Sequence, residues 1–221
     1  MKTDQQLKQD VIAELGWEPA VDASQIGVEV EDGIVTLAGH VGSFTEKWQA
    51  EQATQRVAGV RGLAVEMDVN LPGMSNRTDA DLARSVENTL QWLSYLPTNA
   101  VKVLVENGWV TLSGEVDWNY QRLDVADVVR HLIGIRGLTE SIGIKSRTAL
   151  TSTGTIKADI EAALRRRTDS KFQDITVAVH DGDVTLSGRV QSLWNRERAR
   201  ELAWSSAGVK HVKDELKISF I

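Results

Sequence analysis

The stretch Gly33-Ile-Val-Thr-Leu-Ala-Gly39-His-Val41 decides how this chain is organised, because close copies of it follow twice. They read Gly108-Trp-Val-Thr-Leu-Ser-Gly114-Glu-Val116 and Gly182-Asp-Val-Thr-Leu-Ser-Gly188-Arg-Val190. The copies lie 75 and 74 residues apart, and other apolar and glycine positions keep the same spacing. The sequence therefore predicts three copies of one unit. We place them at residues 1–71, 77–146 and 152–221 and call them units 1, 2 and 3.

Each unit begins with a helix pattern followed by a hairpin pattern. Leu7, Val11 and Leu15 form one helical stripe, repeated as Leu82, Val86 and Leu90 and as Ile156, Ile160 and Leu164. Thr3 with Gln6, and Thr78 with Asp81, resemble N-terminal capping pairs. The alternating residues 26–30 and the residues 35–37 predict two strands, joined at Asp32-Gly33. Asn-Gly and Asp-Gly between such runs are strong hairpin signals.

The rest of each unit predicts a second helix and a last strand. In unit 1 the helix spans about residues 46–58, with Ala50, Ala53 and Val57 on one face, and the strand spans residues 63–69. The predicted fold class is α+β: three tandem αββαβ units, each with two helices on one face of a three-stranded mixed sheet. Units this small have marginal cores, so we expect them to pack on one another. The glycines expected at turns and helix caps are Gly33, Gly39, Gly59, Gly108, Gly114, Gly134, Gly182, Gly188 and Gly208.

The repeated hairpin motif resembles the BON domain, named after bacterial osmotically inducible and nodulation proteins. The resemblance covers essentially the whole chain as three tandem copies. It implies an αββαβ fold and a non-enzymatic role in binding phospholipid membranes or protecting the cell envelope under osmotic stress. A cytoplasmic relative that joins one BON domain to a LysM domain binds potassium, so the resemblance also allows a small-cation binder.

The N-terminal residues suggest a cytoplasmic protein. Residues 1–17 carry five charged side chains and lack the uncharged apolar stretch of a secretory signal. A chain whose signal has already been removed is the competing explanation. Many tandem BON proteins are exported or lipidated, and this sequence shows neither a signal nor a lipobox cysteine. We therefore expect a cytoplasmic location, with peripheral attachment to the inner membrane as an option.

The composition offers no catalytic constellation. The chain has no cysteine, which excludes disulfides, thiol catalysis and cysteine-ligated zinc. None of the four histidines has a second His or a Cys at ligand spacing. The repeated glycines flank a hairpin, whereas a phosphate-binding loop joins a strand to a helix. We expect no enzyme activity, no cofactor and no metal site.

Charge is distributed unevenly along the chain. Residues 1–72 carry 5 basic and 12 acidic residues, residues 73–150 carry 8 and 9, and residues 151–221 carry 12 and 10. The candidate lipid- or anion-binding residues are Arg165, Arg166, Arg167, Arg196, Arg198 and Arg200. Basic clusters suit anionic bilayers, and cations also suit a helix C-terminus. A third interpretation is attraction between the acidic first unit and the basic third, within a chain or between chains. A net charge of −6 argues against nucleic-acid binding.

Tryptophan is unusually abundant, with seven residues against three Phe and two Tyr. Trp109 aligns with Ile34 and Asp183, so we expect it to be at least partly exposed. Trp118 aligns with two serines, and Tyr120 aligns with Thr45 and Trp194. These alignments predict an aromatic surface on unit 2, used for packing between units, a protein partner or lipid. The candidate interface residues are Trp109, Trp118, Tyr120, Trp92 and Trp194.

The sequence thus favours a non-catalytic, cytoplasmic protein that binds anionic phospholipid peripherally, in an osmotic or envelope stress context. The alternative is a protein-interaction or self-assembling scaffold, with a homo-oligomer as one outcome, built on the aromatic surface of unit 2. A potassium binder is the weaker alternative. The ligand, the oligomeric state and the arrangement of the units are not determined by the sequence.

Overall fold

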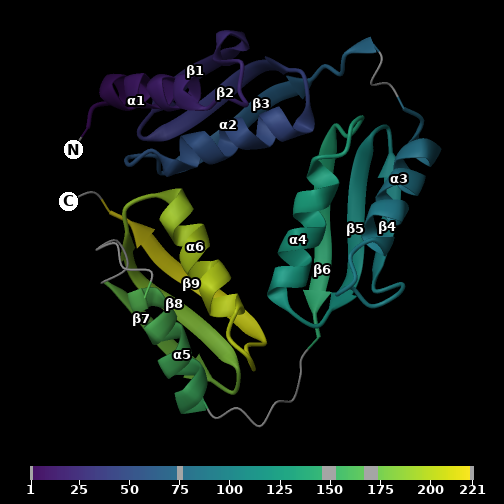
Figure 1. Ribbon diagram of the computed structural model, residues 1–221. Coiled ribbons are helices and arrows are strands. Elements are labelled where there is room, and N and C mark those ends of the chain that lie inside the picture. The colour runs from purple at the N-terminus through teal and green to yellow at the C-terminus, as the bar shows by residue number, and fades with distance from the viewer. Residues whose placement is uncertain (1, 74–76, 146–152, 167–173, 220–221) are drawn as a thin grey trace.

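The computed structural model describes residues 2–73, 77–145, 153–166 and 174–219. It contains three separate αββαβ units, which confirms the predicted fold class (Figure 1). Unit 1 has α1 (Asp4–Trp17), a short 3-10 turn η1 (Ala23–Gln25), β1 (Ile26–Glu31), β2 (Ile34–Val41), α2 (Phe44–Arg56) and β3 (Gly62–Val69). Unit 2 has α3 (Asp79–Gln91), β4 (Val101–Glu106), β5 (Trp109–Val116), α4 (Asn119–Arg130) and β6 (Gly137–Ile144). Unit 3 has α5 (Thr153–Arg166), β7 (Ile175–His180), β8 (Asp183–Val190), α6 (Leu193–Trp204) and β9 (His211–Ile218).

Each unit folds around a mixed sheet of three strands. In unit 1 the strand order is β1-β2-β3, with β1 and β2 antiparallel and β2 and β3 parallel. A hairpin can join antiparallel strands, but parallel strands need a crossover connection, and α2 supplies it. Units 2 and 3 repeat this order and register. The two helices cover the inner face, and the outer face of each sheet carries mostly exposed residues.

The helical stripes of the repeats form the cores. Leu7, Val11 and Leu15 are buried, as are their counterparts in units 2 and 3. The second helix of unit 1 begins at Phe44, two residues earlier than predicted, because the Ser43 side chain accepts a hydrogen bond from the Glu46 amide. It ends at Arg56, and the buried Val57 follows as the C-cap residue.

A carboxylate at the start of the first helix holds the hairpin turn in two of the three units. Asp79 accepts hydrogen bonds from the backbone amides of Asn107 and Gly108, both at 2.8 Å. Asp4 accepts the equivalent pair from Asp32 and Gly33, at 3.0 and 3.1 Å. Unit 3 has Thr153 at this position, and a threonine side chain contains no carboxylate. The first helix and the hairpin are thereby tied together in units 1 and 2.

All nine glycines expected at turns and caps have positive φ angles. At Gly39, Gly114 and Gly188 a Cβ atom would also lie about 2 Å from the backbone carbonyl oxygen of the residue just before the neighbouring strand, at 2.1, 2.1 and 1.9 Å. Glycine is therefore required at these three positions by conformation and by space.

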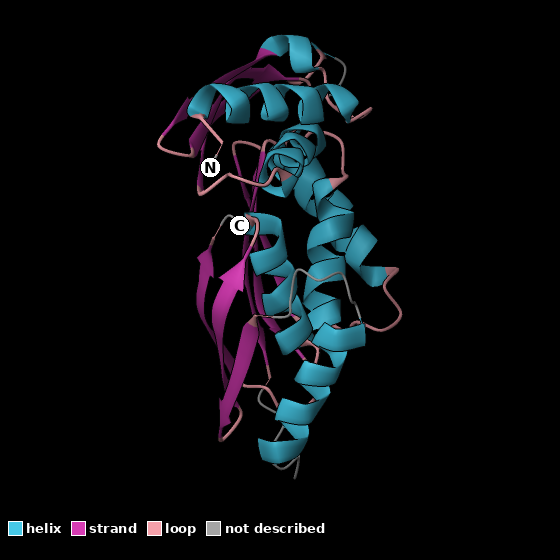
Figure 2. Cartoon of the chain, turned by 90° about the vertical axis from the view of Figure 1, so that its left-hand side faces the viewer, coloured by secondary structure: helices cyan, strands magenta, loops and turns pink. Residues whose placement is uncertain are grey.

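The three units are arranged in a closed ring, because unit 1 contacts both of the others and units 2 and 3 also touch (Figure 1). Helices α2, α4 and α6 face the centre, with the N-terminal end of each directed at the C-terminal end of the next. Equivalent positions are thus related by an approximate threefold rotation. Helices lie mainly on one side of this ring and strands mainly on the other (Figure 2).

Candidate binding surfaces

The interface between units 1 and 2 combines apolar, polar and cation–π contacts. Phe44, at the start of α2, packs against the core of unit 2. The Thr45 hydroxyl donates a hydrogen bond to the Arg130 carbonyl oxygen at 2.9 Å. The Arg130 guanidinium stacks on the Trp48 ring at 4.2 Å from its centroid, and burial lowers its pKa. Such a desolvated cation–π pair contributes about 2 kcal/mol.

The other two interfaces use equivalent helix ends with different side chains. Between units 1 and 3, α2 contacts α6, and Leu193 packs against the core of unit 1. Between units 2 and 3, the Arg122 guanidinium lies 5.9 Å from the centroid of the Trp204 ring. Arg122 also lies 3.1 Å from the Glu140 carboxylate of its own unit. Burial raises the pKa of Glu140. Arg122 and Arg130 oppose this rise, and Glu197 of unit 3 adds to it.

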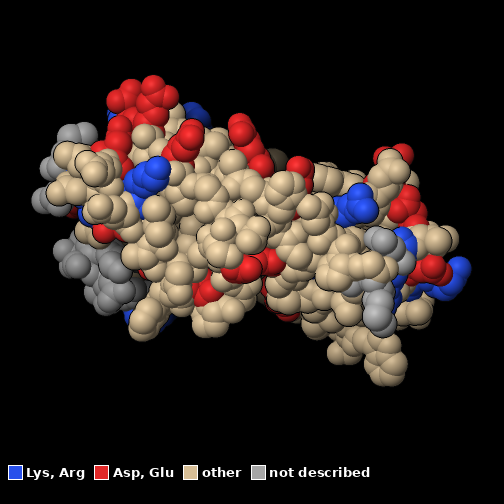
Figure 3. Space-filling model, turned by 90° about the horizontal axis from the view of Figure 1, so that it is seen from above, with Lys and Arg blue, Asp and Glu red and all other residues tan. Residues whose placement is uncertain are grey.

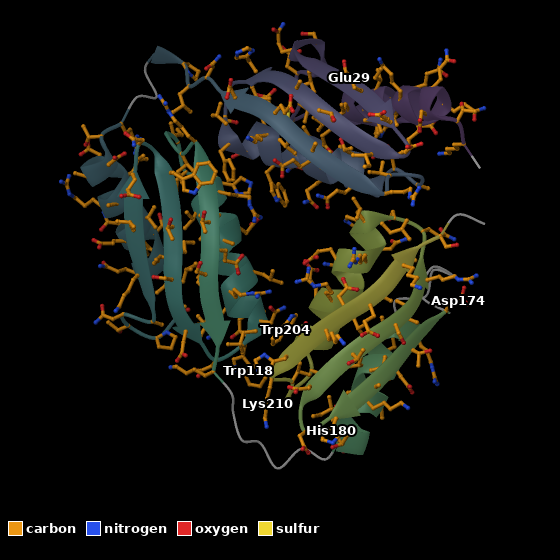
Figure 4. All side chains as sticks on the ribbon, turned by 180° about the vertical axis from the view of Figure 1, so that it is seen from behind. Glu29, Trp118, Asp174, His180, Trp204 and Lys210 are labelled. Atoms are coloured by element: carbon orange, nitrogen blue, oxygen red, sulfur yellow. The ribbon has the colours of Figure 1, made fainter. Side chains whose placement is uncertain are left out.

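The predicted aromatic residues do not form one surface. Trp109 lies at the start of β5 and Trp118 beyond its end, and eight residues of strand separate such positions by more than 20 Å. Trp109 is half-exposed, as expected, and its indole N–H donates to Thr139 at 2.8 Å while its ring covers Gly137. Trp118 lies beside Trp204 and Lys210 where units 2 and 3 meet (Figure 4).

The other predicted aromatic residues do not contact Trp109 or Trp118 in any contact described for them. Tyr120 and Trp194 contact neighbours within their own units. The ring of Tyr120 lies 5.7 Å from that of Tyr95, centroid to centroid. Burial and the nearby Asp124 raise the pKa of Tyr95 to about 12. Trp194 lies 5.8 Å from the Arg198 guanidinium. Trp92 follows α3 and belongs to a different surface, described below.

The candidate arginines separate into two groups. Arg196, Arg198 and Arg200 form ion pairs inside unit 3, with Asp214 at 2.7 Å, Glu201 at 2.5 Å and Glu197 at 2.6 Å. Arg165 and Arg166 lie at the C-terminal end of α5, where the Arg165 side chain is 81% exposed and 3.6 Å from Glu161. Arg167 lies outside the described residues. The end of α5 is therefore the more accessible cationic site of the two.

Two highly exposed tryptophans lie at equivalent helix ends. Trp17 ends α1 and is 84% exposed, and Trp92 follows α3 and is 87% exposed. The equivalent residue of unit 3 is Arg166. Sequence reasoning missed Trp17, although its spacing of 75 residues from Trp92 was available in the internal alignment. These three residues thus mark the same position of the repeat, at the C-terminal end of the first helix of each unit.

The outer sheet face of unit 1 carries several acidic side chains. The exposed acidic residues of the unit 1 sheet are Glu29, Glu31, Glu66 and Asp68. Viewed over unit 1, acidic side chains follow one edge of the molecule (Figure 3). The outer faces of units 1 and 2 also expose Ile34, Leu104 and Trp109.

A cleft of about 540 Å³ lies where unit 3 approaches unit 1, between the start of α1, the Asp32-Gly33 turn and Gln191. Two of its charged residues are already engaged. Lys2 pairs with Asp10 at 2.6 Å, and Asp4 binds the turn amides. Within the described residues, no cluster of three His, Cys, Asp or Glu side chains fits a metal ion. The same part of the chain contains no helix with the length and apolarity needed to cross a bilayer.

The repeat, the mixed sheet and the glycine positions agree with one known domain. The sequence model of the BON domain matches residues 3–70, 78–145 and 152–219. The chain belongs to the BON domain family. The three BON units thus account for almost all of the sequence.

Among characterised proteins, the chain is similar to osmotically-inducible protein Y of Escherichia coli strain K12. The two are 25% identical over 177 residues, which cover 76% of this chain and 86% of that protein.

Comparison with solved structures adds little. The C-terminal domain of CdsD, a structural protein of the type III secretion system of Chlamydia trachomatis, is 14% identical over 100% of both chains, with a TM-score of 0.27. The periplasmic domain of PrgH from S. typhimurium is 14% identical over 88% of this chain and 95% of that one, with a TM-score of 0.23. Such low TM-scores carry no argument about the arrangement of the units.

Proposed function

We propose that this chain is a non-catalytic, stress-associated BON protein that attaches peripherally to anionic phospholipid. The observation that carries the proposal is the set of equivalent helix ends with Trp17, Trp92 and the Arg165–Arg166 pair. The stress context is supported by the similarity to osmotically-inducible protein Y. A cytoplasmic location, at the inner leaflet, is part of the proposal.

The chemistry of these helix ends suits a membrane interface. Tryptophan concentrates at the headgroup level, because its ring is apolar and its indole N–H is polar. Two indoles that each bury roughly 100 Å² would gain about 2.5 kcal/mol apiece. Each arginine near an anionic surface adds about 1 kcal/mol. Stable attachment needs more than one such signal, and three equivalent helix ends supply them together.

The test is co-sedimentation of the protein with vesicles of phosphatidylglycerol and phosphatidylcholine, or of phosphatidylcholine alone, at low and moderate salt. We expect binding to the anionic vesicles only, weakened by salt. Replacing both arginines (Arg165→Gln with Arg166→Gln) should weaken it about 30-fold. The pair Trp17→Ala and Trp92→Ala should weaken it at least as much.

The matched control is Trp109→Ala, which removes an exposed tryptophan from the opposite, strand-rich side and should leave binding unchanged. Equal binding to neutral vesicles, or a double tryptophan variant that binds like the wild type, would overturn the proposal.

A protein-interaction or self-assembling role is the second candidate. It is favoured by the apolar side chains on the outer sheet faces, Ile34, Leu104 and Trp109. Sedimentation velocity over a range of concentrations tests it. This candidate predicts association that Trp109→Ala weakens and Trp17→Ala does not.

A further inference from the structure

The three interfaces of the ring use the same position, the first residue of the second helix of each unit. This residue is Phe44 in unit 1, Asn119 in unit 2 and Leu193 in unit 3. Phe44 packs against the core of unit 2, and Leu193 packs against the core of unit 1. Two of the interfaces are therefore sealed by a large apolar side chain from the neighbouring unit.

The third interface has an amide at this position. Asn119 is only 2% exposed, and neither its Nδ2 nor its Oδ1 atom has a hydrogen-bond partner among the described residues. It lies one turn before Arg122, on the helix face that meets Trp204 of unit 3. A buried amide without partners is unfavourable, because it loses its hydrogen bonds to water and gains none.

The receiving side of this interface is also polar. The cores that receive Phe44 and Leu193 include Leu132 and Val57, whose equivalent in unit 3 is Ser206. The Ser206 hydroxyl is buried and likewise has no partner among the described residues. At these two equivalent positions, the 2–3 interface has polar residues where the other two interfaces have apolar ones.

The cation–π contact between units 2 and 3 is longer than the one between units 1 and 2. The Arg122–Trp204 distance is 5.9 Å, against 4.2 Å for Arg130–Trp48. The carboxylates of Glu140 and Glu197 repel each other across the 2–3 interface, although Arg122 and Arg200 pair with them on their own sides. The 1–2 interface has in addition the Thr45–Arg130 hydrogen bond.

We infer that the ring opens reversibly between units 2 and 3, by small rotations about the other two interfaces. Opening hydrates Asn119 and Ser206 and exposes Trp204 and the start of α4 to water. Closing returns the ring to the arrangement of Figure 1. The inference does not depend on lipid binding, since it rests on the contacts between the units alone.

Distances between spin labels test this opening. The chain has no cysteine, so single cysteines can be introduced without removing others. Glu31, Glu106 and His180 are equivalent, exposed residues at the hairpin ends. Three doubly labelled variants report the distances between the units. They are Glu31→Cys with Glu106→Cys for units 1 and 2, Glu106→Cys with His180→Cys for units 2 and 3, and Glu31→Cys with His180→Cys for units 1 and 3. We expect the pair on units 2 and 3 to show the broadest distribution, with a component at longer distance.

Two matched variants distinguish opening from general flexibility. Asn119→Leu with Ser206→Val places the apolar residue types of the other units in the 2–3 interface, and should reduce the long-distance component about tenfold. Phe44→Asn with Leu132→Ser transfers the polar pair to the 1–2 interface, and should broaden the distance between those units instead.

Two results would overturn the inference. One is a wild-type distribution between units 2 and 3 as narrow as the other two, as expected if trapped water satisfies Asn119. The other is a sealed variant, still folded by circular dichroism, whose distribution matches the wild type.

Discussion

Replacing Asp79 by alanine removes the contact that joins the first helix of unit 2 to its hairpin turn. The carboxylate accepts two amide hydrogen bonds at 2.8 Å, and bonds to a charged group contribute about 1.5–3 kcal/mol each. Water can hydrate the Asn107 amide once the carboxylate is gone, so the lower end of this range applies. We expect a loss of about 3 kcal/mol, which corresponds to roughly a hundredfold in an equilibrium constant.

The assay is amide hydrogen exchange followed by NMR, which observes the Asn107 and Gly108 amides individually. Their protection should fall by up to about a hundredfold in Asp79→Ala and by less in Asp79→Asn, which keeps one acceptor oxygen. Asp4→Ala should have a smaller effect in unit 1, because its bonds are longer, at 3.0 and 3.1 Å. Thr153→Asp should introduce the missing contact into unit 3. Unchanged exchange of both turn amides in Asp79→Ala would refute the reasoning.

Two further predictions concern backbone space and pH. Gly114→Ala places a Cβ atom 2.1 Å from the Ala100 carbonyl oxygen at a φ of +134°, and should cost more than about 2 kcal/mol. Gly143→Ala meets only ordinary contacts and serves as its control in urea unfolding, where equal costs would contradict this account. Burial raises the pKa of Glu51 although Lys47 opposes the rise. The folded state therefore binds the Glu51 carboxyl proton more tightly than the unfolded state does. The stability that this gives is fully present below the ordinary pKa of glutamate and is lost as the pH rises through the raised pKa of the folded state. Glu51→Gln should raise the melting temperature at neutral pH but not near pH 4, and a gain independent of pH would argue against burial as the cause.

The fold of each unit was predictable because its determinants recur. The stripes that start at Leu7, Leu82 and Ile156 and the three Gly-containing hairpins report the same structure three times. A pattern that arises by chance in one copy does not recur in the other two, so recurrence identifies the patterns that reflect structure. The second helix was placed two residues late in unit 1, since the Ser43 cap was not recognised.

The arrangement of the units was not predictable, because its determinants lie where the copies differ. Phe44, Asn119 and Leu193 are equivalent but chemically unlike, a pattern that suggests an exposed position. Each of these three residues instead lies at a different interface between units, so their chemical differences reflect three different interfaces. Trp48 and Arg130 likewise have no matching pair at the equivalent positions of the other units.

The candidate site was predicted only in part. Trp92 was named as a candidate interface residue, but the internal alignment was not used to find Trp17, its equivalent in unit 1. The grouping of Trp109 with Trp118 and Tyr120 was wrong, because closeness in sequence along a strand does not bring side chains together. The ion pairs of Arg196, Arg198 and Arg200 depend on partners that a count of basic residues does not consider.

The contact between α2 and α6 also limits how this gene could lengthen or shorten by duplication. In a linear array, a further repeat can be added at either end, because the terminal units have a free side. Here the first and last units already occupy each other's contact sides. A fourth copy would have to displace Leu193 from the core of unit 1, and loss of unit 1 would uncover both Leu193 and Leu132. Adding or removing a copy would therefore disturb contacts at both ends of the array and not at one end alone.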